Sequence, residues 1–146
     1  MSDSLELHLT KVIKAKRSRV FAAWTEAELM RQWLAPGELI SPRATSDPRV
    51  GGNFIIHMEG MMGEKFTRGI ASGTFEEIVP NERLVFTWNW EGDYRPPQTV
   101  ITVSLRDVDG GTELTLSQVG FGDEGHQSGY SAGWESAFAK LRTIIE

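Results

Sequence analysis

The sequence is 146 residues long and contains no cysteine. This absence excludes disulfides, thiolate zinc sites and cysteine nucleophiles. No apolar run approaches the length of about 18 residues at which a transmembrane helix is expected, and the N-terminus lacks the basic and apolar regions of a secretory signal. We therefore expect a cytoplasmic protein without a membrane span. The net charge of −5 argues against nucleic acid as a partner, because phosphates require a basic surface.

Histidine is scarce, and its spacing matches no metal site. The three histidines are His8, His57 and His126, and no two are separated as paired zinc ligands are. The H-x-E triplet that begins at His57 matches part of the zinc deaminase signature, but that signature also requires cysteine ligands. We therefore expect neither a metal nor a cofactor.

Two glycine-rich motifs match catalytic or nucleotide-binding patterns without their structural context. Residues 120–125 match G-x-G-x-x-G, but only one helix follows them, so no βαβ unit can form. Asp123 and Glu124 would also lie where a pyrophosphate should bind. Residues 129–133 match G-x-S-x-G, but no histidine follows Ser131 to complete a hydrolase triad. The small residues there indicate instead that a helix approaches a sheet closely.

Large aromatic residues are abundant, with five tryptophans and seven phenylalanines, and such residues dominate cores and ligand-binding walls. The last segment, from about Asp123 to Glu146, carries an apolar stripe with the 3.6-residue period of a helix. The stripe comprises Trp134, Ala137, Phe138, Leu141, Ile144 and Ile145, and Tyr130 and His126 extend it toward the start of the helix. Such a helix must bury this stripe against another surface, and the preceding segments are mainly strands.

The strands are predicted from alternation of apolar and polar residues. Gly69 and Gly73 indicate bends or bulges in one long strand and leave its inward face undetermined. Residues 39–50 contain two prolines and predict an edge strand or a loop, and residues 91–97 predict a loop. The predicted strands cover residues 5–10, 53–59, 66–79, 83–90, 99–106 and 114–118.

Two short helices are predicted between the first strand and the rest. Ser18 is expected to cap the first, and Thr25 and Glu28 are expected to form a capping box for the second, which Pro36 ends. Strand, two helices, a run of strands and a long helix together predict an α+β fold. We expect one domain spanning residues 1–146, in which a curved antiparallel sheet of six to seven strands wraps around the C-terminal helix.

The inward-facing residues of the strands and the terminal helix predict a cavity for a small hydrophobic or amphipathic ligand. A few polar groups in an aromatic cavity suit such a ligand, and Gln118 and His126 are expected to orient its polar group. The predicted ligand-binding residues are Phe54, Ile56, Phe86, Trp88, Ile101, Val103, Leu116, Gln118, His126, Tyr130 and Trp134.

A set of motifs in a fixed order resembles a known family over nearly the whole chain. The set comprises Val20–Thr25, Gln32-Trp33, Pro36, Gly51–Phe54, Arg83–Trp88, Gly111–Leu116 and Gly133-Trp134. Together they resemble the activator of Hsp90 ATPase homologue 1-like family, part of the SRPBCC superfamily with the START and Bet v 1-like proteins. The resemblance implies a helix-grip fold and a hydrophobic cavity, and it implies no universal catalytic residue.

Two other functions are compatible with the sequence. A cyclase or hydrolase-like enzyme would need a buried acid/base pair, for which Glu59, His57 and His126 are the candidates. A protein-interaction module, with a chaperone or a second copy of the chain as partner, would use an exposed aromatic patch around Trp24 and Trp33. We do not expect chaperone stimulation, because the eukaryotic activator carries a further N-terminal domain and this chain begins close to its first strand.

Overall fold

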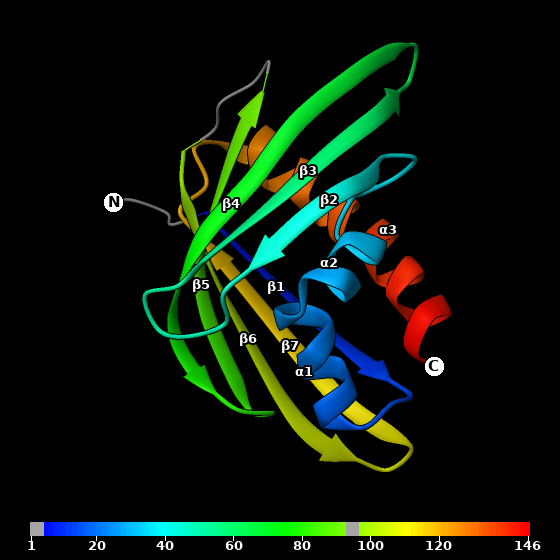
Figure 1. The fold of residues 1–146 in the computed structure, drawn as a ribbon, viewed down its shortest axis with the longest axis vertical. Coiled ribbons are helices and arrows are strands. Elements are labelled where there is room, and N and C mark those ends of the chain that lie inside the picture. The colour runs from blue at the N-terminus through cyan, green and yellow to red at the C-terminus, as the bar shows by residue number, and fades with distance from the viewer. Residues whose placement is uncertain (1–4, 93–96) are drawn as a thin grey trace.

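The computed structural model describes residues 5–92 and 97–146, so part of the predicted 91–97 loop lies outside the described residues. Seven strands form one antiparallel sheet in the order β1-β7-β6-β5-β4-β3-β2 (Figure 1). The strands are β1 (Glu6–Ile13), β2 (Ile40–Ser46), β3 (Asn53–Met62), β4 (Lys65–Val79), β5 (Arg83–Gly92), β6 (Thr99–Val108) and β7 (Gly111–Val119). The helices are α1 (Arg17–Thr25), α2 (Ala27–Trp33) and α3 (Glu124–Ile145). The predicted α+β helix-grip fold is confirmed.

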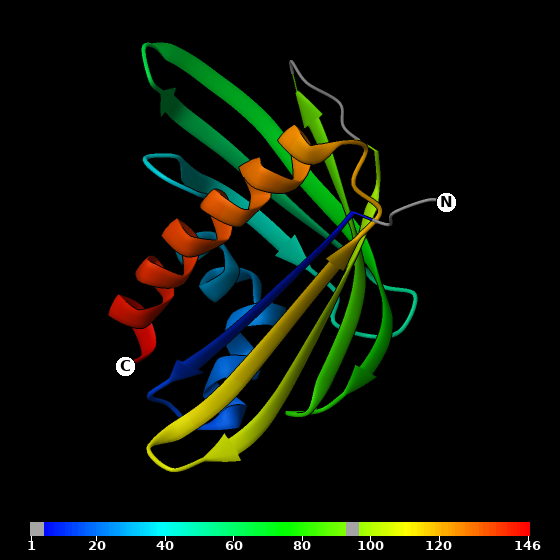
Figure 2. The same ribbon diagram turned by 180° about the vertical axis from the view of Figure 1, so that it is seen from behind.

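The sheet curves around α3, which crosses its concave side (Figure 2). Helices α1 and α2 lie on this side too: α1 packs against β6 and β7, and α2 packs against β2 and α3. Strand β2 pairs only with β3 and forms one edge of the sheet, which confirms the edge-strand prediction. Alternation is clearest in β7, where every second residue from Thr112 to Gln118 is buried, because successive side chains point to opposite faces.

Strand β4 buries its odd-numbered residues from Gly69 to Phe75, including Gly73. The amide of Thr74 donates to the hydroxyl of Thr87 at 2.9 Å, and a Cβ on Gly73 would lie 1.8 Å from the carbonyl oxygen of Thr87. Gly73 therefore lies where β4 and β5 approach closely, and the bend expected at this glycine stays a prediction. The shift in pairing with β5 occurs further along, between Phe75 and Glu77.

Both predicted helix caps are wrong. Helix α1 begins at Arg17, so Ser18 lies within its first turn, and Lys16 is the N-cap. Thr25 is the last residue of α1, and its hydroxyl donates to the carbonyl of Phe21 at 3.0 Å, so it does not cap α2. The Glu28 carboxylate accepts from Arg31 instead of reaching back to an amide.

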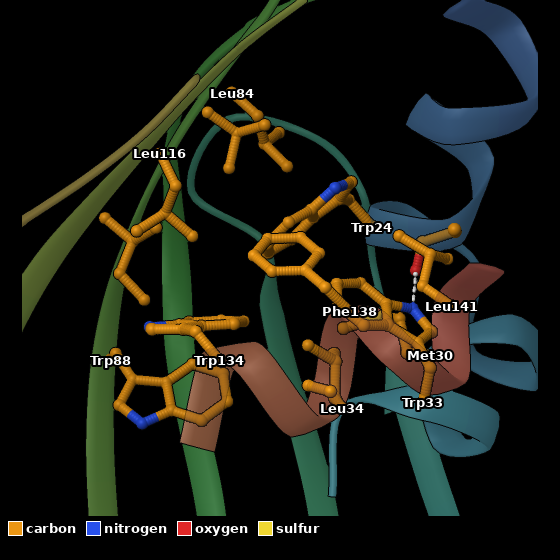
Figure 3. Close-up of a cluster of buried hydrophobic side chains, with 14 of the residues drawn as sticks. Trp24, Met30, Trp33, Leu34, Leu84, Trp88, Leu116, Trp134, Phe138 and Leu141 are labelled. Atoms are coloured by element: carbon orange, nitrogen blue, oxygen red, sulfur yellow. Dashed lines mark hydrogen bonds between the residues drawn. The ribbon is translucent and has the colours of Figure 1, made fainter. Parts of the chain in front are cut away.

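The second half of α3 packs onto an aromatic core supplied by α1 and α2 (Figure 3). The ring of Trp33 stacks on Phe138 with centroids 5.8 Å apart, and Trp24 meets the edge of Trp33 at 4.7 Å. The indole nitrogen of Trp33 donates to the carbonyl of Ala23 at 2.9 Å. Trp24 and Trp33 are 2% and 1% exposed, so the predicted exposed aromatic patch is wrong.

Candidate functional site: a cavity under the first half of helix α3

A cavity of about 580 Å³ lies between the first half of α3 and strands β3, β4 and β5. The segment that joins α2 to β2 forms a further wall. The lining comprises Leu34, Pro36, Leu39, Met58, Lys65, Thr67, Trp88, Trp90, Asp123, Gly125, His126, Gly129, Tyr130, Gly133, Trp134 and Ala137. A volume of this size is within the range of small-molecule sites, about 300–1,000 Å³.

The cavity exists because the two halves of α3 carry different side chains. The second half projects Phe138 and Leu141 into the packed core. In the first half, Gly129 and Gly133 line the cavity. A Cβ on Gly129 would meet nothing within 4 Å, and one on Gly133 would come no closer than 3.5 Å to Pro36. The predicted close approach of these residues to the sheet is wrong: they leave space above it.

Most of the buried lining residues are apolar, and the charged lining residues are exposed. Leu34, Leu39 and Met58 are all at most 4% exposed, whereas Lys65 and Asp123 are exposed residues of the same lining. A cavity with an apolar interior and charged groups at its exposed part suits an amphipathic molecule, since each end then meets a matching environment.

Aromatic side chains from β5 and α3 meet at one wall of the cavity. The indole nitrogen of Trp88 donates to the hydroxyl oxygen of Tyr130 at 2.7 Å. The Tyr130 ring lies 5.2 Å from His126 and 5.7 Å from Phe121, measured between centroids. Trp134 lies 6.1 Å from Trp88 in the same wall. At this wall of the cavity, Trp88 therefore joins α3 to the sheet.

His126 is held at the start of α3 by local backbone contacts. Its Nδ1 accepts a hydrogen bond from the Gly122 amide at 3.2 Å, so the neutral ring carries its hydrogen on Nε2. The Asp123 carboxylate caps the helix by accepting from the His126 amide at 2.8 Å. Burial lowers the pKa of His126 from its ordinary value, and the nearby charge of Asp123 opposes this shift only in part. The imidazole therefore favours the neutral form.

Gln118 fixes the orientation of Trp134. Its side-chain carbonyl accepts from the Trp134 indole nitrogen at 2.8 Å, and its amide nitrogen donates to the Thr99 hydroxyl at 2.9 Å. Gln118 is fully buried. Its polar atoms are thus engaged within the protein, and it positions a wall residue without lining the cavity.

The structure divides the eleven predicted site residues into two groups. Trp88, His126, Tyr130 and Trp134 line the cavity. The other seven are buried in the core or, for Gln118, behind the wall. These seven are Phe54, Ile56, Phe86, Ile101, Val103, Leu116 and Gln118. The sequence pattern places all of them on the inward face, but only those under the first half of α3 reach the cavity.

Several lining residues were not among the predicted set. Met58 and Trp90 continue the inward alternation of Ile56 and Trp88, so strand parity alone would have included them. Lys65 and Thr67 lie on β4, whose inward face could not be predicted because of Gly69 and Gly73. Leu34, Pro36 and Leu39 come from a connecting segment that has no periodicity to identify them.

The three candidate acid/base residues do not come together. Of these, only His126 lines the cavity. His57 lies on the opposite face of β3, where its Nε2 is 3.1 Å from a guanidinium nitrogen of Arg43. Glu59, on that same face, pairs with Arg68 at 3.3 Å.

Residues 5–92 and 97–146 contain no group of three or more His, Cys, Asp or Glu side chains that could hold a metal ion. None of the described helices has both the length and the apolar character needed to cross a bilayer.

The fold and sequence are similar to those of several known proteins. Protein CV1439 from Chromobacterium violaceum is 23% identical, with a TM-score of 0.82 and 97% of each chain covered. Protein NE0264 from Nitrosomonas europaea is 26% identical, with a TM-score of 0.76, over 97% of this chain and 95% of that one. The AHSA1 protein SPO3351 from Silicibacter pomeroyi is 23% identical, with a TM-score of 0.80, over 94% of this chain and 95% of that one.

A comparison with curated proteins finds no match. The family model described as "Activator of Hsp90 ATPase homolog 1-like protein" matches residues 14–146, which include all the helices and all the strands after β1. The chain therefore belongs to the activator of Hsp90 ATPase homolog 1-like family, as the motifs in its sequence predicted.

Proposed function

We propose that the protein binds one small apolar or amphipathic molecule in the cavity under the first half of α3. The observation that carries this proposal is the cavity itself, about 580 Å³ of space between a helix and a sheet whose remaining interface is closely packed. Apolar residues such as Leu34 and Met58 line this space, and an apolar molecule bound there would remove their surface from water.

The lining favours a particular orientation of the ligand. Its apolar part would contact Leu34, Met58 and Trp134, which surround the buried portion of the cavity. A polar head would lie beside Lys65 and Thr67 on β4. We still expect His126 to orient the polar group of the ligand, whereas Gln118 acts only by positioning Trp134.

The tryptophans of the cavity wall provide a direct test. Three of the five tryptophans, Trp88, Trp90 and Trp134, line the cavity, so a bound molecule changes the surroundings of most of the emitting rings. Titration with 1-anilinonaphthalene-8-sulfonate and with straight-chain fatty acids should change tryptophan emission saturably, with one molecule bound per chain. N-acetyltryptophanamide, titrated in parallel, corrects for absorption by the probes. A flat or non-saturating response to every probe would count against the proposal.

The other hypotheses gain no support from the site. The predicted aromatic interaction surface is buried. Of the three acid/base candidates, only His126 lines the cavity, and Glu59 pairs with Arg68, so the expected pair does not form. A chaperone partner, a homodimer and a cytoplasmic location stay predictions from the sequence.

A further inference from the structure

We propose that Trp90, held against Gly69, sets the extent of the cavity and thereby determines which ligands fit. The part of this inference that concerns ligands rests on the proposed function, whereas the part that concerns cavity shape stands on geometry alone.

The indole of Trp90 occupies space that two paired glycines leave open. Trp90 on β5 pairs with Ala71 on β4, and its ring extends diagonally over Gly69. A Cβ built on Gly69 would lie 2.0 Å from Cζ2 of this ring and 2.4 Å from Cη2. Gly92 pairs with Gly69, and a Cβ there would lie 3.2 Å from Nε1 of the same ring. The ring therefore rests directly on the backbone of the sheet, and a side chain at Gly69 fits only if the indole moves.

A second glycine on β4 shows what is special about this site. The ring of Phe54 lies 2.7 Å from a Cβ built on Gly73, and the backbone carbonyl oxygen of Thr87 lies nearer still, at 1.8 Å. Phe54 is 1% exposed and surrounded by core residues, so its ring has nowhere to move. Trp90 is half-buried and has the cavity on its free side. A side chain at Gly69 would therefore push the indole into the cavity, whereas one at Gly73 would disrupt the core.

This difference makes Gly69 and Trp90 a pair that controls cavity size. The substitution Gly69→Ala should move the indole away from the sheet and reduce the space available to a ligand. Trp90→Ala should enlarge that space toward β4. Changes of one or a few carbon atoms in an apolar site alter affinity by roughly 10–200-fold, so ligands of different length should respond differently to the two substitutions.

The geometric part is tested by crystal structures of the wild type and of Gly69→Ala. We expect the Trp90 indole to shift into the cavity in Gly69→Ala, with a smaller cavity volume and an otherwise unchanged fold. An indole that keeps its position, with the β4 backbone moving instead, would overturn the inference. Gly73→Ala serves as the comparison, and we expect it to lose most of its folded protein.

The ligand part is tested by titrating fatty acids of increasing chain length into four proteins: the wild type, Gly69→Ala, Trp90→Ala and the double variant. We expect Gly69→Ala to weaken binding of the longest acids by about tenfold or more, and Trp90→Ala to shift the preference toward longer acids. In the Trp90→Ala background, Gly69→Ala should have no further effect. An equal loss in both backgrounds would show that Gly69 does not act through Trp90. If the wild type binds neither 1-anilinonaphthalene-8-sulfonate nor any fatty acid, the proposed function fails, and the crystal structures still decide the role of Trp90.

Discussion

Replacing Gly129 by leucine should weaken binding of apolar probes by at least about tenfold while leaving the fold intact. Gly129 lines the cavity from α3, and a side chain there meets no other atom within 4 Å of its Cβ. The first side-chain carbon of a leucine is therefore accommodated without displacing the protein, and we expect the remaining atoms to occupy part of the cavity that Gly129 lines. Leucine is also favoured over glycine in a helix by up to about 1 kcal/mol, so the free energy of unfolding should rise slightly.

Weaker binding together with unchanged or higher stability would show that the leucine blocks the cavity without unfolding the protein. Binding is measured by titration with 1-anilinonaphthalene-8-sulfonate, and stability by urea denaturation. Ser128→Leu is the matched control, because Ser128 is the preceding, exposed residue of α3 and does not line the cavity. Gly129→Leu that binds the probe as tightly as the wild type and Ser128→Leu would contradict the assignment of the site.

Replacing Trp33 by alanine should lower the free energy of unfolding by about 3–5 kcal/mol, the usual cost of truncating a buried aromatic residue. Trp33 is 1% exposed, stacks on Phe138 and loses its hydrogen bond to Ala23 in the variant. Its removal separates α2 from α3 at the place where the two helices meet. A loss of this size is a large share of the total free energy of unfolding of a domain, about 5–15 kcal/mol.

Trp90→Ala is the comparison for this prediction, since Trp90 is half-buried and borders empty space. Its truncation should cost clearly less than that of Trp33 in the same urea denaturation experiment. Equal losses of unfolding free energy for the two substitutions would mean that the cavity wall is packed as tightly as the core. This result would contradict the division between a cavity under the first half of α3 and a packed core under the second half.

The fold could be predicted from the sequence because its signals are local and repeated. The apolar stripe of α3 and the alternation in β5, β6 and β7 each follow from one periodicity, and the structure has these elements close to the expected boundaries. The Ser18 cap was wrong because α1 begins at Arg17, before this serine, and the Thr25 cap was wrong because a hydroxyl can bond to the helix that ends as well as to the helix that begins. Thr25 donates to Phe21 in the preceding helix, which the sequence does not reveal.

The site could be predicted only in part, because core and cavity wall share the same parity. Trp88 and Phe86 both face inward from β5, yet only Trp88 lines the main cavity. Whether an inward residue of β5 lines the cavity or the core depends on where α3 crosses the sheet. No local sequence pattern predicts that position. The glycines of α3 were also misinterpreted, since a small residue is compatible both with close packing and with open space.

A crystal structure of the wild-type protein grown with 1-anilinonaphthalene-8-sulfonate tests the central claim most directly. We expect density for one probe molecule beneath the first half of α3, with its rings against Met58, Trp88 and Trp134. A structure in which side chains fill that space, or in which the probe binds only elsewhere on the protein, would contradict it.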